Sequence, residues 1–181
     1  KVKANFVETF WYEEMSDLAD FVDGEGQNLF VRPNQVIACS LEYSPLTDEM
    51  KRGVLDIVGN MLVTPKGLRT LSPRNPLYEG RYEGDQATRD REYHQGTVWP
   101  WLIGPYIEAN FRLYGKKFVK TAKELLAGFE EDIAYYGVCS IGEVYDGNPP
   151  YMPNGSISQA WSVGEVLRSM AMVKRYEKMK E

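Results

Sequence analysis

Apolar side chains recur at helical spacing along three long segments of the chain. Residues 116–136 carry an apolar side chain at every third or fourth position, with Lys and Glu between them. Residues 47–62 begin with Thr47, a typical N-cap residue, and continue with two acids in the first turn. Residues 157–178 are widely apolar at first and end in basic side chains. These patterns predict three clear helices.

Weaker helical periodicity marks three further segments, 2–21, 34–43 and 98–114. The last of them contains Pro105, which predicts a kink or a late helix start. No segment shows sustained alternation of apolar and polar residues, so the pattern predicts an all-α fold without strands. We expect the helices to pair as hairpins: 2–21 with 34–43, 47–62 with 98–114, and 116–136 with 157–178.

Long connections separate these hairpins at residues 22–33, 63–97 and 137–156. Ordered loops longer than about 12–15 residues are usually functional. Residues 63–97 are rich in Tyr and Arg and contain the single histidine, a composition that does not resemble disorder. Aromatic residues make up 13% of the whole chain and are frequent in these loops. We therefore expect the long loops to form a pocket at one end of the helices.

Composition narrows the class of protein. With 181 residues the chain can form one domain, and its net charge of −5 argues against a nucleic-acid-binding surface. No apolar run approaches the ~18–20 residues needed to span a membrane. Cys39 and Cys139 each lie in or beside an apolar segment and are expected to be small buried side chains rather than a disulfide or metal pair. A single histidine makes a structural zinc site improbable.

The loops supply the groups that proteins use to hold sugars. A sugar ring has apolar CH faces and a rim of hydroxyls, which flat aromatic rings and planar polar groups contact. The relevant stretches are "RPNQ" at 32–35, "GLRTLS" at 67–72, "YHQGTVWPW" at 93–101 and "EVYDG" at 143–147. Each also has an ordinary structural explanation, such as an ion pair, core packing or a solvated loop acid. Composition and spacing alone indicate a helical protein with a polar and aromatic pocket.

An ordered series of motifs resembles a known family. The stretches are "RPNQVIACSL", "TPKGLRTLSP", "YHQGTVWPWLIGPYIEA" and "GEVYDG" followed by "GSISQAWSVGEVLR". The series covers nearly all of residues 4–170 and resembles the carboxy-terminal part of glycogen debranching enzymes of the amylo-α-1,6-glucosidase type. The acid-containing segment is also similar to one in inverting glucoamylases and trehalases.

The resemblance implies an (α/α)6 toroid, in which twelve helices form two rings around a central pocket. Residues 1–181 would then be a single fragment, the C-terminal half of such a glycoside hydrolase catalytic domain. Its helical hairpins would form roughly half of the toroid.

The resemblance also implies that Glu143 is the general base that activates water. Inverting hydrolysis needs two carboxyl groups about 6.5–9.5 Å apart, and the second must be a protonated acid. The family's acid is an Asp upstream of this chain, and Glu13, Glu14 and Asp17 look like the solvated face of a helix. The isolated fragment is therefore expected to be inactive. Asp146 is expected to form the turn or orient the loop by hydrogen bonds.

Matched positions around the base would bind sugar. His94, Gln95 and Trp99 rank first, because a polar pair beside an aromatic wall can hold a rim of hydroxyls. The full set of expected substrate-binding residues is Arg32, Asn34, Gln35, Arg69, His94, Gln95, Trp99, Trp101 and Trp161.

The leading hypothesis is a hydrolase that releases glucose from α-1,6 branch points of glycogen or a related α-glucan with inversion. An α-1,4-glucosidase of the glucoamylase type and a trehalase stay open, because subsite loops set linkage preference, although the "YHQGTVWPW" form favours the debranching type. A non-catalytic helical carbohydrate-binding domain and a helical-repeat interaction domain are the other classes.

The expected partners are an α-glucan oligosaccharide or glycogen and the N-terminal half of the parent catalytic domain, with no nucleic acid and no membrane. Carboxylates and water suffice for the reaction, so neither a cofactor nor a metal is expected. A half-toroid would expose apolar helix faces, so the fragment is expected to self-associate. The family resemblance and the sparse cysteines indicate the cytoplasm.

Overall fold

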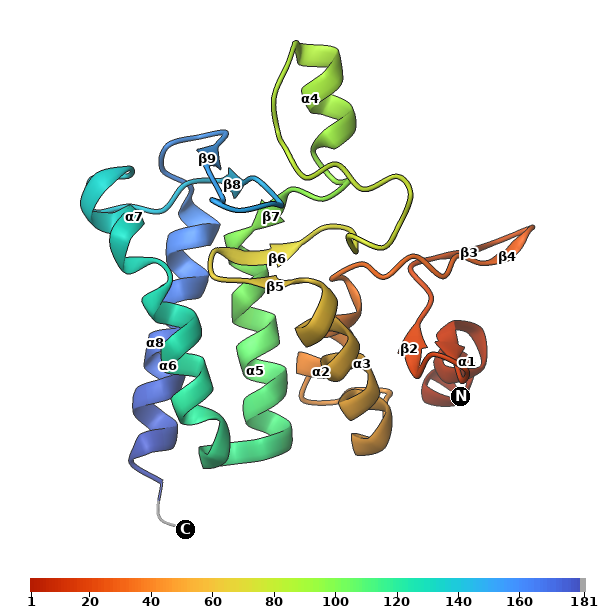
Figure 1. Cartoon of the computed structure of the whole chain (residues 1–181). Coiled ribbons are helices and arrows are strands. Elements are labelled where there is room, and N and C mark those ends of the chain that lie inside the picture. The colour runs from red at the N-terminus through yellow and green to blue at the C-terminus, as the bar shows by residue number, and fades with distance from the viewer. Residues whose placement is uncertain (180–181) are drawn as a thin grey trace.

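The computed structural model describes residues 1–179, of which roughly half lie in helices. The longer helices stand side by side, and a small sheet lies across one end of them (Figure 1). Two 3-10 segments, η1 (Pro100–Leu102) and η2 (Gly115–Phe118), precede α5 and α6. The α-helices are α1 (Val2–Phe10), α2 (Gln35–Ser40), α3 (Asp48–Met61), α4 (Gln86–Glu92), α5 (Ile103–Tyr114), α6 (Val119–Ala127), α7 (Glu130–Tyr135) and α8 (Ala160–Glu177).

The sheet is an antiparallel meander of five very short strands built from the two longest connections. Leu68 lies opposite Trp99, and Val98 lies opposite Tyr145. In spatial order the strands are β5 (Val63–Thr64), β6 (Gly67–Arg69), β7 (Val98–Trp99), β8 (Val144–Tyr145) and β9 (Pro153–Asn154). Two separate hairpins are formed by β1 (Trp11–Tyr12) with β2 (Asp17–Leu18), and by β3 (Val22–Asp23) with β4 (Gly26–Gln27).

These strands correct the expectation of an all-α fold, which holds only for the helical majority of the chain. Each strand has two or three residues. A run that short cannot show a period-two alternation, so the sequence pattern gave no signal for it. The sheet matters for function because it joins the loop segments that surround the cavity described below.

Helix α3 begins where the sequence predicts, whereas α5 and α8 begin a few residues later than their predicted segments, 98–114 and 157–178. The Thr47 hydroxyl accepts a hydrogen bond from the Met50 N–H at 3.2 Å and caps α3. The late start expected from Pro105 is also observed, because residues 98–102 form β7 and η1 before α5 begins at Ile103. Pro105 then falls in the first turn of α5, where a missing N–H breaks no helical hydrogen bond.

The predicted helix over 116–136 is divided at Gly128 by a tertiary contact. Lys66, in the turn between β5 and β6, donates to the Gly128 carbonyl at 2.8 Å. A Cβ on Gly128 would lie 2.0 Å from the Pro65 carbonyl oxygen, so the turn approaches this point as closely as glycine allows. The helix therefore ends at Ala127 and restarts as α7 at Glu130.

The predicted helix over 2–21 ends at Phe10, because Trp11 and Tyr12 pair with residues 17 and 18 in a hairpin. The second strand of this hairpin packs against α3. Asp17 is consequently only 2% exposed, which corrects its expected place on a solvated helix face. Burial raises the pKa of its carboxyl to about 6.

Two of the three expected helix pairs are observed as packed neighbours. Helix α6 packs on α8, and α3 packs on α5. Helix α2 packs mainly on α5 and also on α3, whereas α1 contacts β1, so the expected pairing of the first two segments is wrong. Phe111 and Tyr176 stack with ring centroids 4.2 Å apart and join α5 to α8 in the core.

Both cysteines are unpaired, Cys39 buried in α2 and Cys139 exposed, so the expected burial holds for the first alone. Within residues 1–179, no helix is long and apolar enough to cross a membrane. The same described residues contain no group of three or more His, Cys, Asp or Glu side chains arranged to hold a metal ion.

Candidate functional site

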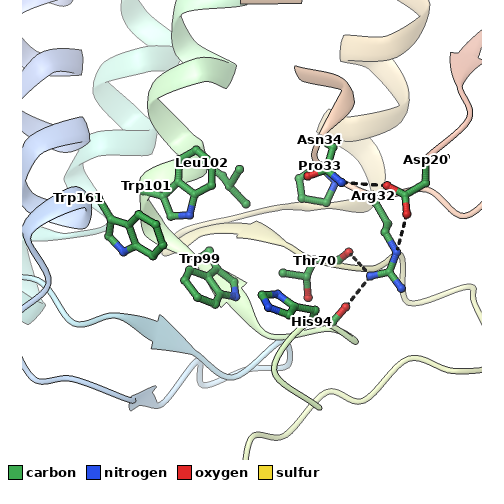
Figure 2. A pocket seen from close by; sticks show the side chains of 10 residues that line it. All are labelled: Asp20, Arg32, Pro33, Asn34, Thr70, His94, Trp99, Trp101, Leu102 and Trp161. Carbon is green, nitrogen blue, oxygen red and sulfur yellow. Dashed lines mark hydrogen bonds and ion pairs between the residues drawn. The ribbon is translucent and has the colours of Figure 1, made fainter. Parts of the chain in front are cut away.

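A cavity of about 380 Å³ lies between the sheet end of the helices and the segment that precedes α2 (Figure 2). Its size falls in the range of small-molecule sites, about 300–1,000 Å³. The walls come from the chain before α2, the segments joined by β6 and β7, η1, and the first turn of α8. The lining residues are Asp20, Arg32, Pro33, Asn34, Thr70, His94, Trp99, Trp101, Leu102 and Trp161.

One wall of the cavity is a continuous row of rings. His94 stacks on Trp99 with centroids 5.4 Å apart and an interplanar angle of 14°. Trp99 meets the Trp161 ring edge-on at 5.4 Å, and Trp161 stacks on Trp101 at 5.6 Å. Trp161 is 46% exposed, although it is a large indole. The exposed Trp161 ring, supported by its neighbours in this row, provides a flat apolar surface for the CH face of a sugar.

The opposite wall is polar and is organised by Arg32 (Figure 2). Its Nε lies 3.3 Å from the Asp20 carboxylate, and its Nη1 donates to the backbone carbonyls of Thr70 and His94 at 3.0 and 2.5 Å. Asn34 donates to the other oxygen of Asp20 at 2.9 Å. Arg32 therefore holds both the loop that carries His94 and the side chain of Asp20 in place.

His94 is the single histidine of the chain and lies where the two walls meet. Partial burial of the ring and the nearby positive charge of Arg32 lower the pKa of His94. The imidazole is therefore neutral at pH 7. A neutral imidazole offers one donor and one acceptor, which suits it to bind sugar hydroxyls.

Glu143 lies one side chain behind the aromatic wall and does not itself line the cavity. Its Oε1 accepts a hydrogen bond from the Tyr93 hydroxyl, and its Oε2 accepts one from the Ser156 N–H at 2.8 Å. The Tyr93 ring lies 5.0 Å from the His94 ring and 4.8 Å from the Trp99 ring. The carboxylate is thus connected to the cavity wall through Tyr93.

Local backbone structure explains this position. Glu143 immediately precedes β8, which pairs with β7 on one side and β9 on the other. Gly155 has φ +68°, and a Cβ there would lie 2.6 Å from the Glu143 Oε2. Glycine is thus required both by the left-handed backbone and by the close approach to the carboxylate.

The charge state of Glu143 reflects two opposing effects. Partial burial acts to raise its pKa, whereas hydrogen bonds from Tyr93, Ser156 and Gln159 act to lower it. The hydrogen bonds prevail, and the pKa of Glu143 lies below its ordinary value. The side chain is a carboxylate at neutral pH and can accept a proton.

Three residues expected to bind substrate lie behind the cavity lining. Gln35 is buried and donates to the Arg32 carbonyl at 3.1 Å. Gln95 accepts from the Arg32 Nη2 at 2.9 Å. Arg69 donates to the Gly147 carbonyl at 2.8 Å and so links β6 to the end of β8. These side chains support the cavity and the Glu143 segment rather than face the open space.

Asp146 has the orienting contacts expected from the sequence. It is buried, and its Oδ1 accepts from the Tyr82 N–H and from the Asn154 side chain, each at 3.0 Å. Arg81 approaches its other oxygen at 3.4 Å. Asp146 therefore ties the loop of residues 78–82 to the β8–β9 hairpin, three residues after Glu143.

Sequence reasoning missed three polar residues of the site. Asp20 and Thr70 line the cavity, and Tyr93 contacts Glu143. The signals were weak: Asp20 is an acid shortly before "RPNQ", and Tyr93 is the first residue of "YHQGTVWPW". Their partners are 12 to 50 residues away in the sequence, and spacing alone does not indicate such contacts.

Comparison with known proteins gives a family match and a similar enzyme. Residues 1–168 match the amylo-alpha-1,6-glucosidase family. A glycogen debranching enzyme from Saccharomyces cerevisiae is 29% identical over 115 residues, which are 59% of this chain and 8% of that enzyme.

Among solved structures, neutral trehalase from Saccharomyces cerevisiae superposes with a TM-score of 0.67 at 14% sequence identity. The match covers 96% of this chain and 30% of the trehalase chain. At this identity the likeness shows a trehalase-like helical fold. The chain spans less than a third of the length of either relative.

Proposed function

This chain belongs to the amylo-alpha-1,6-glucosidase family, and from that membership we propose that it forms part of the active site of an inverting α-glucosidase. The domain is a glycoside hydrolase domain related to glycogen debranching enzyme and to trehalase. The proposed reaction is hydrolysis of α-1,6-glucosidic branch linkages in glycogen or a related α-glucan. Glucose is released with inversion at its anomeric carbon.

The observation that carries this proposal is the placement of Glu143 beside the aromatic wall. Its carboxylate is ionised, has two fixed hydrogen-bond donors, and is joined to the cavity through the Tyr93 ring. A general base of an inverting enzyme must be ionised and held in a fixed orientation, because it must accept a proton from a positioned water.

The chemical step is a single displacement. Glu143 takes a proton from water, and the water oxygen forms a bond to the anomeric carbon on the face opposite the leaving group. The glycosidic C–O bond breaks at the same time, and a general acid protonates the departing oxygen. Atoms balance without a cofactor: one water is consumed and two hydroxyl groups are formed.

We assign the general acid to the N-terminal half of the parent catalytic domain, the longer protein that we propose contains this chain. The carboxylate that lines the cavity within residues 1–179 is Asp20, and both of its oxygens already accept from Arg32 and Asn34. It is therefore poorly placed to donate a proton. On this proposal the chain is the C-terminal half of an (α/α)6 toroid and is inactive by itself.

The cavity lining suggests how glucose is held. Exposed Trp161 offers a stacking surface, while His94 and Asn34 present polar groups beside it. A volume of about 380 Å³ accommodates one sugar ring together with waters. Arg32 acts mainly by holding Asp20 and the His94 loop in place.

Substitution of Glu143 by Gln in the parent enzyme tests the proposal. We expect kcat for glucose release to fall by about 10²–10⁴-fold, because the amide cannot accept the proton from water. Oligosaccharide affinity, measured by calorimetry, should change little because the shape of the side chain is kept.

The matched control is Glu79→Gln, an exposed acid on the neighbouring loop, which should leave turnover unchanged. Full activity in Glu143→Gln would reject the proposed base. The same assay decides linkage: faster turnover of linear α-1,4 oligosaccharides or of trehalose than of branched substrate would replace the α-1,6 assignment.

A further inference from the structure

Tyr93 connects the candidate base to the cavity wall through one side chain. Its hydroxyl donates to Glu143, and its ring meets Trp99 at 4.8 Å with an interplanar angle of 64°. Its backbone carbonyl accepts from the Trp99 Nε1 at 3.2 Å. The His94 ring lies 5.0 Å away on the cavity side. The phenol is therefore held by contacts on its ring and on its main chain.

We propose that Tyr93 is a positioning residue that fixes the orientation of the Glu143 carboxylate and keeps it available to accept a proton from water. This inference rests on the proposed role of Glu143 as general base. Tyr93 holds Oε1 while the Ser156 N–H holds Oε2, so the carboxylate cannot rotate without losing a hydrogen bond. Each oxygen keeps a further lone pair, and one of these can accept from the attacking water.

The hydrogen bond has a fixed direction. Burial and the adjacent Glu143 both raise the pKa of Tyr93, so the phenol stays protonated and remains the donor throughout the neutral range. Its donation in turn acts to lower the pKa of Glu143 against the effect of burial. The pair therefore consists of a neutral donor and a charged acceptor, the stronger class of hydrogen bond.

Other groups around Glu143 do not replace this donor. The Tyr82 phenol faces it from the same side of the site, with its ring 5.7 Å from that of Tyr93. Ser156 and Gln159 face it from the segment before α8. In residues 1–179, none of the ion pairs includes Glu143. Neutral hydrogen-bond donors, with Tyr93 foremost, therefore lower the pKa of Glu143, an effect that a basic side chain has on other carboxylates.

The direct test is Tyr93→Phe in the 181-residue chain, which removes the hydroxyl and keeps the ring. Carbon-13 NMR of the Glu143 carboxyl, assigned by its loss in Glu143→Gln, should show that the pKa of Glu143 rises. Tyr78→Phe is the matched control, because the Tyr78 hydroxyl donates to Asn148 at 3.0 Å and not to Glu143. An unchanged titration of Glu143 in Tyr93→Phe would overturn the inference.

A reciprocal measurement keeps the test independent of how well Tyr93→Phe folds. The NMR signal of the Tyr93 ring carbon that bears the hydroxyl should shift as Glu143 takes up its proton, because the two groups share a hydrogen bond. In Glu143→Gln this pH-dependent shift should be absent. A Tyr93 signal that stays unchanged through the Glu143 titration would contradict the coupling.

In the parent enzyme, Tyr93→Phe should lower kcat near neutral pH about tenfold, the equivalent of losing one hydrogen bond of ordinary strength. The acid limb of kcat/KM should move to higher pH, because the base works only when ionised and its pKa rises. A purely structural role predicts lower stability with an unchanged pH profile. A sugar-contact role predicts a higher KM with kcat retained. Either pattern would overturn the inference.

The two proposals fail in different ways. If Glu143→Gln abolishes turnover while Tyr93→Phe changes neither the pH profile nor the Glu143 titration, the positioning role alone is wrong. If Glu143→Gln keeps full turnover, the proposed base is wrong, and the positioning role for catalysis falls with it even where the NMR coupling is observed.

Discussion

At the scale of single residues, Asp17 shows how a buried acid makes stability depend on pH. Its pKa is raised by burial to about 6, against 3.8 for an unperturbed carboxyl. Between these two values the folded chain binds more protons than the unfolded chain, so the free energy of unfolding falls as pH rises through this window. Above this pH window, the buried charge of the Asp17 carboxylate lowers the free energy of unfolding by a constant amount.

Asp17→Asn should therefore stabilise the chain at pH 7.5 by about 1–2 kcal/mol, after discount for partial solvation of the carboxyl. The gain should disappear below about pH 4, where the acid is protonated in both states. Urea unfolding at the two pH values measures this, with the exposed Asp56→Asn as control. A gain of equal size at both pH values would show that burial of the charge is not its cause.

The residue scale also shows what sequence could and could not predict about the site. His94 and Trp99 were placed near each other because they lie in one motif, and the structure puts them in one wall. Gln35 and Gln95 belong to equally specific motifs, yet both turn their polar groups to Arg32. A motif identifies residues that act together, but whether an amide faces ligand or supports a neighbour depends on packing across the fold.

At the scale of elements, the β5–β6 turn is joined to α7 by a buried ion pair. Lys66 Nζ lies 2.8 Å from Asp132, and the two side chains are only 10% and 8% exposed. The pair holds the sheet edge against the helical layer, at the point where the helix divides (Figure 1). Removing one partner leaves a buried charge without compensation.

Lys66→Met should cost about 3–5 kcal/mol in the free energy of unfolding, measured with urea. The double variant Lys66→Met/Asp132→Leu should recover part of that loss, because no lone charge remains. Lys120→Met is the control, since both side chains of its ion pair with Glu124 are largely exposed, at 89% and 64%, and the pair should be worth at most about 1 kcal/mol. Equal effects at the two lysines would show that burial does not determine the cost.

Element boundaries mark the limit of prediction at this scale. Helix α3 followed from its cap and its apolar stripe, both of which are local signals. The division at Gly128 did not, because it depends on Lys66 reaching across from a turn 62 residues away. Strands β7 and β8 are also products of tertiary contact, since two-residue strands form only when neighbouring segments supply the partners.

At the scale of the whole molecule, helices α1 and α8 lie on opposite flanks (Figure 1), and both carry exposed apolar side chains. Val2 on α1 is 84% exposed and Tyr43 after α2 is 89% exposed, while Leu167 on α8 is 59% exposed. Such surfaces are typical of faces that a partner covers. In the proposed toroid, the N-terminal half of the catalytic domain would cover them.

The isolated chain should therefore self-associate. Light scattering coupled to gel filtration should show a mass that rises with protein concentration, and the effect should weaken when the N-terminal half of the parent domain is added. A compact monomer at every concentration would contradict the proposed half-toroid.

The central claim is that Glu143 is the base of an inverting displacement, and azide rescue tests it most directly. In the parent enzyme, Glu143→Ala leaves space for a small anion that needs no base. With α-glucosyl fluoride as substrate, azide should restore turnover at least tenfold and yield β-glucosyl azide, detected by NMR. No rescue, or a product that keeps the α configuration, would contradict the account.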